Sequence, residues 1–419
     1  NDYSSPYAQL NYTGYSTENE NRNMLTLRLN QKIGGFFEGL ILSAQVMSDL
    51  QTFIVEGRRM WPNMYRATGR DSQGKLIKSL RLREQTVSYF KGSNHWRKYY
   101  MESKADWNRT FGDHTLGALL FYYMEDVQDG RWEYDLLGIN SIPARRQNLS
   151  GRLSYGYNDT YFIDANFGYT GSSQFQKGDR YGLFPSVAVG WVPTAYEWVN
   201  DNVPWLSFLK VRGSYGLAGN DQISGDVRFP YLTLINNYAG AYWGYRGNGI
   251  TESKVGADNL KWEIATKKNI GVDARLFNDK VSFTIDFFRD QRDNIFQERR
   301  TLPNYLGLVN LPYSNVGRMH SYGSDGNIEF KQKINNEMDF TLRANYTFSE
   351  NMLDYYEENI LPYNYLSWSG KPYGILRVYI AEGLFKDKEE IETSPDQGTF
   401  GRIRPGDIKY RDVNGDGRI

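Results

Sequence analysis

The clearest signal in the sequence is a strict alternation of apolar and polar residues. In Met338–Ser349, the even positions carry Phe, Leu, Ala and Tyr, and the odd positions carry Asp, Thr, Arg and Asn. Arg145–Tyr157 and Tyr161–Thr170 repeat the pattern. Since β-strands have a side-chain period of two, each segment is predicted to be a strand with one apolar and one polar face.

The same template fits further segments and brings the prediction to about twelve strands. These segments are Met24–Ile33, Phe37–Val46, Arg97–Thr110, Thr115–Glu125, Leu183–Val192, Phe208–Leu217, Lys267–Leu276, Val281–Arg292 and Ser321–Lys333. Several strands carry a charge near their middle, namely Arg28, Arg152, Asp164, Asp273, Asp286 and Arg343. Such charges suit the solvated face of a soluble sheet or the polar lumen of a membrane barrel.

The lengths of the connections favour the barrel. Tight turns rich in Gly, Asn and Asp, such as Asn158-Asp159 and Asn278-Asp279, alternate with long loops. The long loops are predicted at 47–84, 126–144, 172–182, 218–266, 293–320 and from 350 onward. Short turns on one side and long loops on the other are typical of outer-membrane barrels. The one longer connection on the short side, Pro193–Ser207, is predicted to contain a short helix at the interface.

The predicted fold class is therefore all-β, an antiparallel transmembrane β-barrel with long extracellular loops and short periplasmic turns. Residues 1–349 are assigned to barrel strands and their loops, and residues 350–419 to a long extracellular region. Because the chain stops in a polar, turn-rich stretch, we expect further residues beyond both ends.

Composition agrees with this interpretation. Aromatic residues make up 16% of the chain, yet the mean hydropathy is −0.63. Aromatic residues gather near strand ends, which predicts girdles at the membrane surfaces, although aromatic residues also favour strands in general. The girdle residues are Tyr155, Tyr157, Tyr161, Tyr169, Tyr181 and Trp191. Lys+Arg and Asp+Glu balance at 49 each, cysteine is absent, and the three histidines have no metal-binding spacing, so nothing indicates nucleic acid or a thiolate metal site.

A series of motifs resembles the SusC/RagA family of TonB-dependent transporters, in the same order along the chain. They are Arg152–Phe167, Gly182–Trp191, Trp205–Lys210, Arg212–Gly216, Asn259–Glu263, Asp286–Phe288, Asn315–Gly317, Gly370–Pro372, Pro405–Tyr410 and Asp412–Gly417. The resemblance covers about Gly151 to Ile419, and the first 150 residues match more loosely. Each motif alone is weak, and together they are specific.

The resemblance implies a barrel of about 22 strands around a plug, of which this chain supplies roughly half the wall. It implies import of oligosaccharides or peptides, a SusD-like lipoprotein lid, and energy from the TonB–ExbB–ExbD system. It also implies a place in the outer membrane of a Bacteroidetes-like Gram-negative cell. No plug and no TonB-contacting segment is recognisable here.

Asp412, Asn414 and Asp416 form a candidate calcium site. Oxygen side chains at positions 1, 3 and 5 with Gly417 at position 6 match the start of an EF-hand loop. The alternative is an ordinary Asp/Asn/Gly turn without an ion. The sequence leaves both open, because the glutamate of position 12 lies beyond Ile419.

Loop aromatics are the candidate substrate-binding residues, because their rings can stack on sugars or contact a partner. They are Trp132, Tyr242, Trp243 and Tyr245. The alternative is that they pack only within their own loops. No catalytic motif is recognisable, so an enzyme is not expected. Active import is the leading hypothesis. A passive porin or surface adhesin on a similar barrel is the first alternative, and a soluble β-rich carbohydrate-binding protein is the second.

Overall fold

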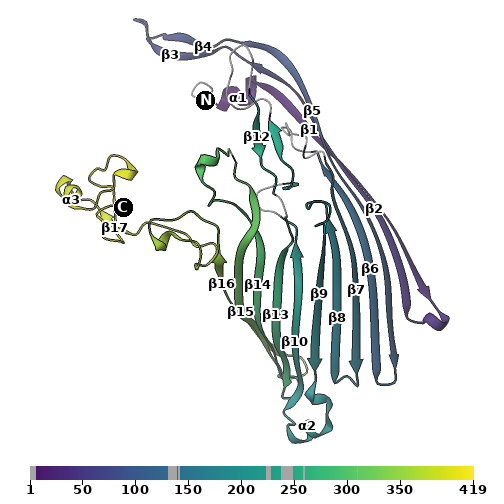
Figure 1. Cartoon of the computed structure of the whole chain (residues 1–419). Coiled ribbons are helices and arrows are strands. Elements are labelled where there is room, and N and C mark those ends of the chain that lie inside the picture. Colours follow the sequence, from purple (N-terminus) through teal and green to yellow (C-terminus); the bar gives the residue numbers. More distant parts are fainter. Residues whose placement is uncertain are drawn as a thin grey trace. The chain divides into compact units, whose positions relative to one another are not determined.

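The larger part of the chain folds into one antiparallel sheet of twelve strands (Figure 1). The computed structural model describes residues 6–130, 139, 142–222, 228–236, 249–257, 260–308 and 310–419. Consecutive sheet strands in the chain are neighbours in the sheet. The strands are β1 (Gly14–Ile33), β2 (Leu40–Trp61), β5 (Gln85–Phe111), β6 (His114–Asp129), β7 (Ala144–Tyr157), β8 (Tyr161–Ser172), β9 (Tyr181–Trp191), β10 (Leu206–Asn220), β13 (Glu263–Leu276), β14 (Val281–Glu298), β15 (Tyr313–Lys333) and β16 (Asp339–Tyr355).

Each predicted strand is present. Most strands are longer than predicted at the end of the sheet where the long connections lie, which we call the loop end. The prediction of a loop at 47–84 is wrong, because β2 continues to Trp61 and β5 begins at Gln85. Between them lies a separate hairpin, β3 (Met64–Arg70) and β4 (Leu76–Leu82). Alternation marks only the part of a strand whose two faces differ. Backbone pairing needs no such pattern, so the ladder continues where the alternation has ended.

The short connections carry the turn residues that the sequence predicts. Asn158 and Asp159 have φ angles of 48° and 47° between β7 and β8, and Asn278 and Asp279 have φ angles of 58° and 62° between β13 and β14. Asn and Asp tolerate this left-handed region better than most residues. The predicted helix in 193–207 is confirmed as η3 (Pro193–Ala195) and α2 (Glu197–Asn202), at the end of the sheet opposite the β3–β4 hairpin (Figure 1).

The remaining elements of this unit, Asn1–Gly370, are small. They are α1 (Pro6–Tyr12), η1 (Gly35–Phe37), the hairpin of β11 (Leu234–Asn236) and β12 (Thr251–Lys254), η5 (Asn304–Leu306) and η6 (Asn364–Leu366). None of the helices in the described ranges is both long enough and apolar enough to cross a membrane.

The strand register separates the sheet into an apolar and a polar face. One row of directly paired residues runs Ile163–Val189–Gly213–Ile270–Phe287 from β8 to β14. Apart from Gly213, these side chains are large, apolar and exposed, with Ile270 63% exposed. The opposite face carries the charges that the sequence places in mid-strand. A sheet with these two faces matches a wall between lipid and an aqueous lumen.

The second compact unit, Lys371–Ile419, folds around a few aromatic rings. β17 (Ala381–Leu384) pairs with β18 (Ile408–Tyr410), and α3 (Lys388–Thr393) and η7 (Gly398–Phe400) lie between them in the chain. The rings of Tyr379, Phe400 and Tyr410 contact one another with centroids 4.9–5.3 Å apart. The buried Gln397 amide donates to the Ile408 carbonyl and accepts from the Tyr410 amide, which ties the unit together.

Leu153 tests which face meets lipid. Leu153 lies on the apolar face of β7 and is 65% exposed. Leu153→Arg is expected to destabilise the barrel in bilayers by about 2–4 kcal/mol, since a cation near the bilayer centre is poorly solvated. Ser150→Arg, on the polar face of the same strand beside Gly168, is the matched control and should cost under about 1 kcal/mol. Urea unfolding in lipid vesicles, followed by heat-modifiable gel mobility, measures both. Equal effects would contradict the assignment of faces.

Candidate functional site

The polar face is organised by ion pairs that cross from strand to strand. Arg212 on β10 donates from Nε to Asp273 on β13 at 3.0 Å and from a terminal nitrogen to Asp286 on β14 at 2.6 Å. The Asp286 side chain is 13% exposed and that of Arg212 is 34% exposed. One guanidinium therefore joins three neighbouring strands and pairs with two carboxylates. Pairing of this kind is what partly buried carboxylates require.

Gly271 makes this arrangement possible. It lies on β13 directly between Arg212 and Asp286 in the pairing ladder. A Cβ at Gly271 would lie 2.6 Å from the Arg212 guanidinium carbon and 2.6 Å from an Asp286 carboxylate oxygen. The Arg212 side chain thus passes over a strand at the one position without a side chain. Motif residues that the sequence presents separately, Arg212–Gly216 and Asp286–Phe288, meet at this point.

A second ion-pair cluster lies toward the loop end. Arg146 on β7 donates both to Asp221, at 2.7 and 2.9 Å, and to Glu125 on β6 at 3.5 Å. Ser172 donates to the same Asp221 carboxylate at 2.7 Å. Because Asp221 directly follows β10, this cluster connects strands that are not neighbours in the sheet. It fixes the position at which the chain leaves the wall after β10.

A hollow of about 380 Å³ lies beside the charged residues of the short-turn half. Its lining includes Arg152, Asp164, Lys210 and Arg212. Arg152 pairs with Asp164, and the Lys210 ammonium lies 5.1 Å from the centre of the Phe162 ring. Fixed charges and hydrogen-bonding groups on a concave wall suit contact with a polar solute or with another polar surface. They do not form a nucleophile with an adjacent general base, the arrangement that covalent catalysis needs.

The loop end contains an apolar cluster that sequence analysis missed. Phe175, Ala257, Leu260, Trp262 and Phe296 are buried together, with Leu260 only 1% exposed. The Phe175 and Trp262 ring centres are 4.9 Å apart, and the Trp262 indole nitrogen donates to the Arg180 carbonyl. The available signal was a pair of large apolar residues, Leu260 and Trp262, inside a stretch predicted as loop. The cluster joins the segments after β8, before β13 and at the end of β14.

Glu357, which follows β16, is hydrogen-bonded to the segment around the end of β14. Its carboxylate, 2% exposed, accepts from Arg299 Nε at 2.7 Å and from the Thr301 hydroxyl. The Glu357 amide in turn donates to the Gln297 side chain. Burial raises the pKa of Glu357, and the hydrogen bonds from Thr301 and Arg299 lower it by more. The Glu357 pKa therefore lies below its ordinary value of 4.5.

The candidate substrate-binding residues are not tested by the structure. Trp132, Tyr242, Trp243 and Tyr245 all lie outside the described residues.

The candidate calcium residues form a tight, internally bonded turn. The Asp412 carboxylate accepts from the amides of Gly415 at 2.7 Å and Gly417 at 2.8 Å. The Asn414 side-chain amide donates to Asp416 at 2.8 Å. The turn thus brings the Asn414 and Asp416 side chains into contact and bonds the Asp412 side chain to the turn's own backbone. Within the described ranges, no group of three His, Cys, Asp or Glu side chains is placed to hold a metal ion, and this turn offers two carboxylates and one amide.

Glu357 gives the loop end a pH dependence. A carboxylate whose pKa is lower in the folded state stabilises that state above the unfolded pKa, near 4.5, and the stabilisation is lost as the pH falls through the folded value. The protection of amides around Arg299 against hydrogen exchange, expressed relative to the intrinsic exchange rate at each pH, should therefore fall below about pH 4.5. Glu357→Gln should raise hydrogen exchange of this segment at neutral pH, because its local stability falls by about 1–3 kcal/mol. The variant should also show a smaller loss of protection on acidification than wild type. Glu337→Gln, in an exposed turn, is the control and should behave like wild type. An unchanged acid response in Glu357→Gln would contradict the assignment.

The sequence is similar to those of known proteins. The family described as "TonB dependent receptor-like, beta-barrel" matches residues 1–405. TonB-dependent receptor P3 of Formosa agariphila is 27% identical over 294 residues, which cover 64% of this chain and 28% of that protein. TonB-dependent receptor SusC of Bacteroides thetaiotaomicron is 29% identical over 218 residues, 50% of this chain and 22% of SusC. This chain thus spans under a third of the length of these relatives.

A solved structure shows the same fold. The RagAB peptide importer in its "closed-closed" state superposes with a TM-score of 0.64 at 19% identity, over 98% of this chain and 45% of the solved chain. The apolar face of the sheet is accordingly the lipid-facing face, and the polar face lines the lumen. The family is one of outer-membrane receptors. This chain belongs to the TonB-dependent receptor-like β-barrel family, and the SusC/RagA type predicted from its motifs is confirmed.

Proposed function

We propose that the protein whose wall this chain forms imports a nutrient, an oligosaccharide or a peptide, across the outer membrane. The observation that carries the proposal is a barrel wall of the SusC/RagA type with a lumen face of fixed, paired charges. Such a face can contact a polar solute without trapping it, because charges such as Arg212, Asp273 and Asp286 already have partners. SusC is named a TonB-dependent receptor and RagAB a peptide importer, which supports the class of activity and leaves open which solute is carried.

The same reasoning assigns partners and location. TonB–ExbB–ExbD supplies the energy, a SusD-like surface lipoprotein covers the extracellular mouth, and the cell is a Bacteroidetes-like Gram-negative bacterium. The relatives from Formosa and Bacteroides support this assignment. The long strands β2 and β5, which in Figure 1 run up to the end of the sheet where the β3–β4 hairpin lies, supply the surface that a lid contacts.

Uptake and conductance together test active import. The full-length protein and the lipoprotein encoded beside it are produced in a Bacteroidetes host, and uptake of labelled oligosaccharide and peptide pools is followed. Uptake should fall to background when tonB is deleted, because a plugged barrel opens only with energy. The purified protein should give no steady conductance in planar bilayers. Steady conductance together with uptake that persists without TonB would establish a passive porin instead.

The Asp412–Gly417 turn carries a second proposal, a structural calcium ion bound by Asp412, Asn414 and Asp416. Hard oxygen ligands at this spacing are the support for it. The full-length protein, washed with calcium-free buffer, should retain stoichiometric calcium in plasma mass spectrometry. Asp412→Asn/Asp416→Asn should lose it and melt at lower temperature in calcium but not in EDTA. Asp387→Asn, at the helix cap of α3 in the same unit, is the control. No calcium in the wild-type protein would make the segment an ordinary turn.

A further inference from the structure

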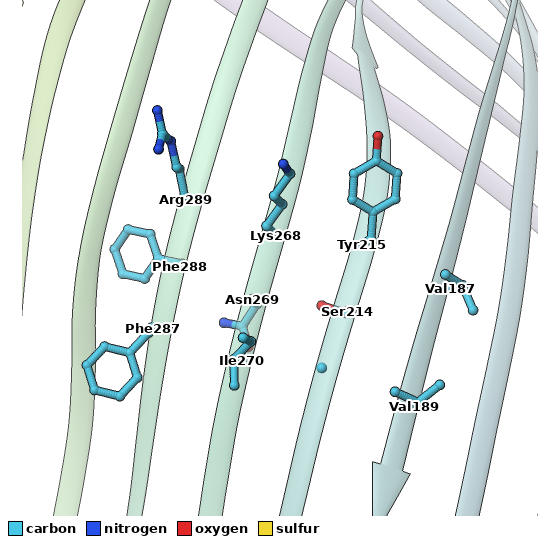
Figure 2. A pocket seen from close by; sticks show the side chains of 11 residues that line it. Val187, Val189, Ser214, Tyr215, Lys268, Asn269, Ile270, Phe287, Phe288 and Arg289 are labelled. Carbon is cyan, nitrogen blue, oxygen red and sulfur yellow. The ribbon is translucent and has the colours of Figure 1, made fainter.

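The lipid-facing side of the wall is not filled evenly. A groove of about 530 Å³ crosses β9, β10, β13 and β14, and Figure 2 shows the side chains around it. Its floor is Gly213, flanked in the pairing ladder by Val189 and Ile270, with Phe287 on the next strand. The groove therefore has apolar walls and lies on the face that meets acyl chains.

Gly213 leaves the groove open. A Cβ at Gly213 would have only the Asn269 carbonyl oxygen nearby, at 3.8 Å, so a larger residue fits without disturbing the sheet. Gly151 on β7 is different, because the Phe167 ring lies 2.4 Å from the position of its Cβ and covers that glycine. The space over Gly213 is thus not taken by a neighbouring side chain.

A polar rim lies on the loop side of the groove. Tyr215, Lys268 and Arg289 pair directly across β10, β13 and β14, and in Figure 2 all three point toward the loop end. The Lys268 ammonium lies 5.9 Å from the centre of the Tyr215 ring. Two cations side by side on neighbouring strands repel each other, so the pair by itself costs stability.

Neither cation has an ion-pair partner in the described part of the wall. On the lumen face the adjacent Lys267 pairs with Asp290 at 3.2 Å, whereas in the described part of the chain Lys268 and Arg289 form no ion pair with a carboxylate. Long cationic side chains near a membrane surface extend toward headgroups in any barrel. Extension alone does not explain two adjacent cations, an aromatic ring and an open apolar groove at one place.

We propose that this groove binds a phosphorylated lipid of the outer leaflet. Its phosphate lies between Lys268 and Arg289, and one acyl chain lies over Gly213 between Val189, Ile270 and Phe287. The loop end is the extracellular end of the family's barrels, which places the rim at the outer leaflet. A phosphate would be a negatively charged partner for both Lys268 and Arg289. The proposal rests on the family and the orientation of the wall, and active import plays no part in it.

Two separate variants distinguish the parts of the site. Lys268→Gln/Arg289→Gln removes the charge, and Gly213→Ile fills the groove with a residue that favours strands. Arg145→Gln is the matched control, because Arg145 lies on the same face near the loop end of β7 but already pairs with Asp126. Heat-modifiable gel mobility verifies that each variant is folded.

Native mass spectrometry of the full-length protein in detergent, with added phosphatidic acid or phosphatidylcholine, measures binding. Wild type and Arg145→Gln should retain phosphatidic acid over phosphatidylcholine. The charge variant should bind it roughly thirtyfold more weakly, since two cations near an anionic lipid are lost. Gly213→Ile should weaken binding while both cations remain.

The other outcomes overturn the proposal. Equal retention by all variants, or an equal loss in Arg145→Gln, would mean general attraction at the interface. If Gly213→Ile binds phosphatidic acid as tightly as wild type, the groove over Gly213 does not hold an acyl chain. Inorganic phosphate that displaces phosphatidic acid at equal concentration would identify a free-anion site.

Discussion

Backbone hydrogen bonding is the constraint on which this structure depends. Inside a bilayer no water is available to amides and carbonyls, so each must pair with a neighbouring strand. Between β1 and β16 the ladder meets this demand by joining each of the twelve sheet strands to the next sheet strand in the chain. Once the register is set, the period of two decides which residues meet lipid. A slip by one residue would turn Arg212 and Asp286 toward the acyl chains.

The two faces of the wall differ in where their charged residues lie and in what those residues pair with. On the lumen face, the carboxylates of Asp273 and Asp286 both pair with Arg212 across strands, and Gly271 provides the space for this contact. On the lipid face charge is scarce and lies near the strand ends. Arg145 there has an internal partner, Asp126. Lys268 and Arg289 depart from both patterns, because neither has a carboxylate partner among the described residues, and the proposed lipid phosphate would supply one.

At the loop end, backbone pairing and contacts between loops determine the structure. Beyond the alternating part of each strand, neither face has to be apolar. Backbone pairing alone extends β2 to Trp61 and β15 back to Tyr313. The connections above the wall are held by side chains instead. The buried cluster around Leu260 and Trp262 and the carboxylate of Glu357 are the main attachments. Binding surfaces of barrels lie in such connections, because a rigid wall positions them.

The sequence by itself determined the twelve strands, the faces and the tight turns, because alternation and the left-handed preference of Asn and Asp are local properties. It also determined the family, through motifs spread along the chain. Tertiary structure decided the rest. The extent of β2 and β5 beyond the alternating pattern depends on partner strands, the junction of Arg212 with Asp286 depends on strand order, and the burial of Leu260 depends on segments distant in the chain. The groove over Gly213 had no sequence signal, since a glycine in a strand reveals nothing about whether a neighbouring ring covers it.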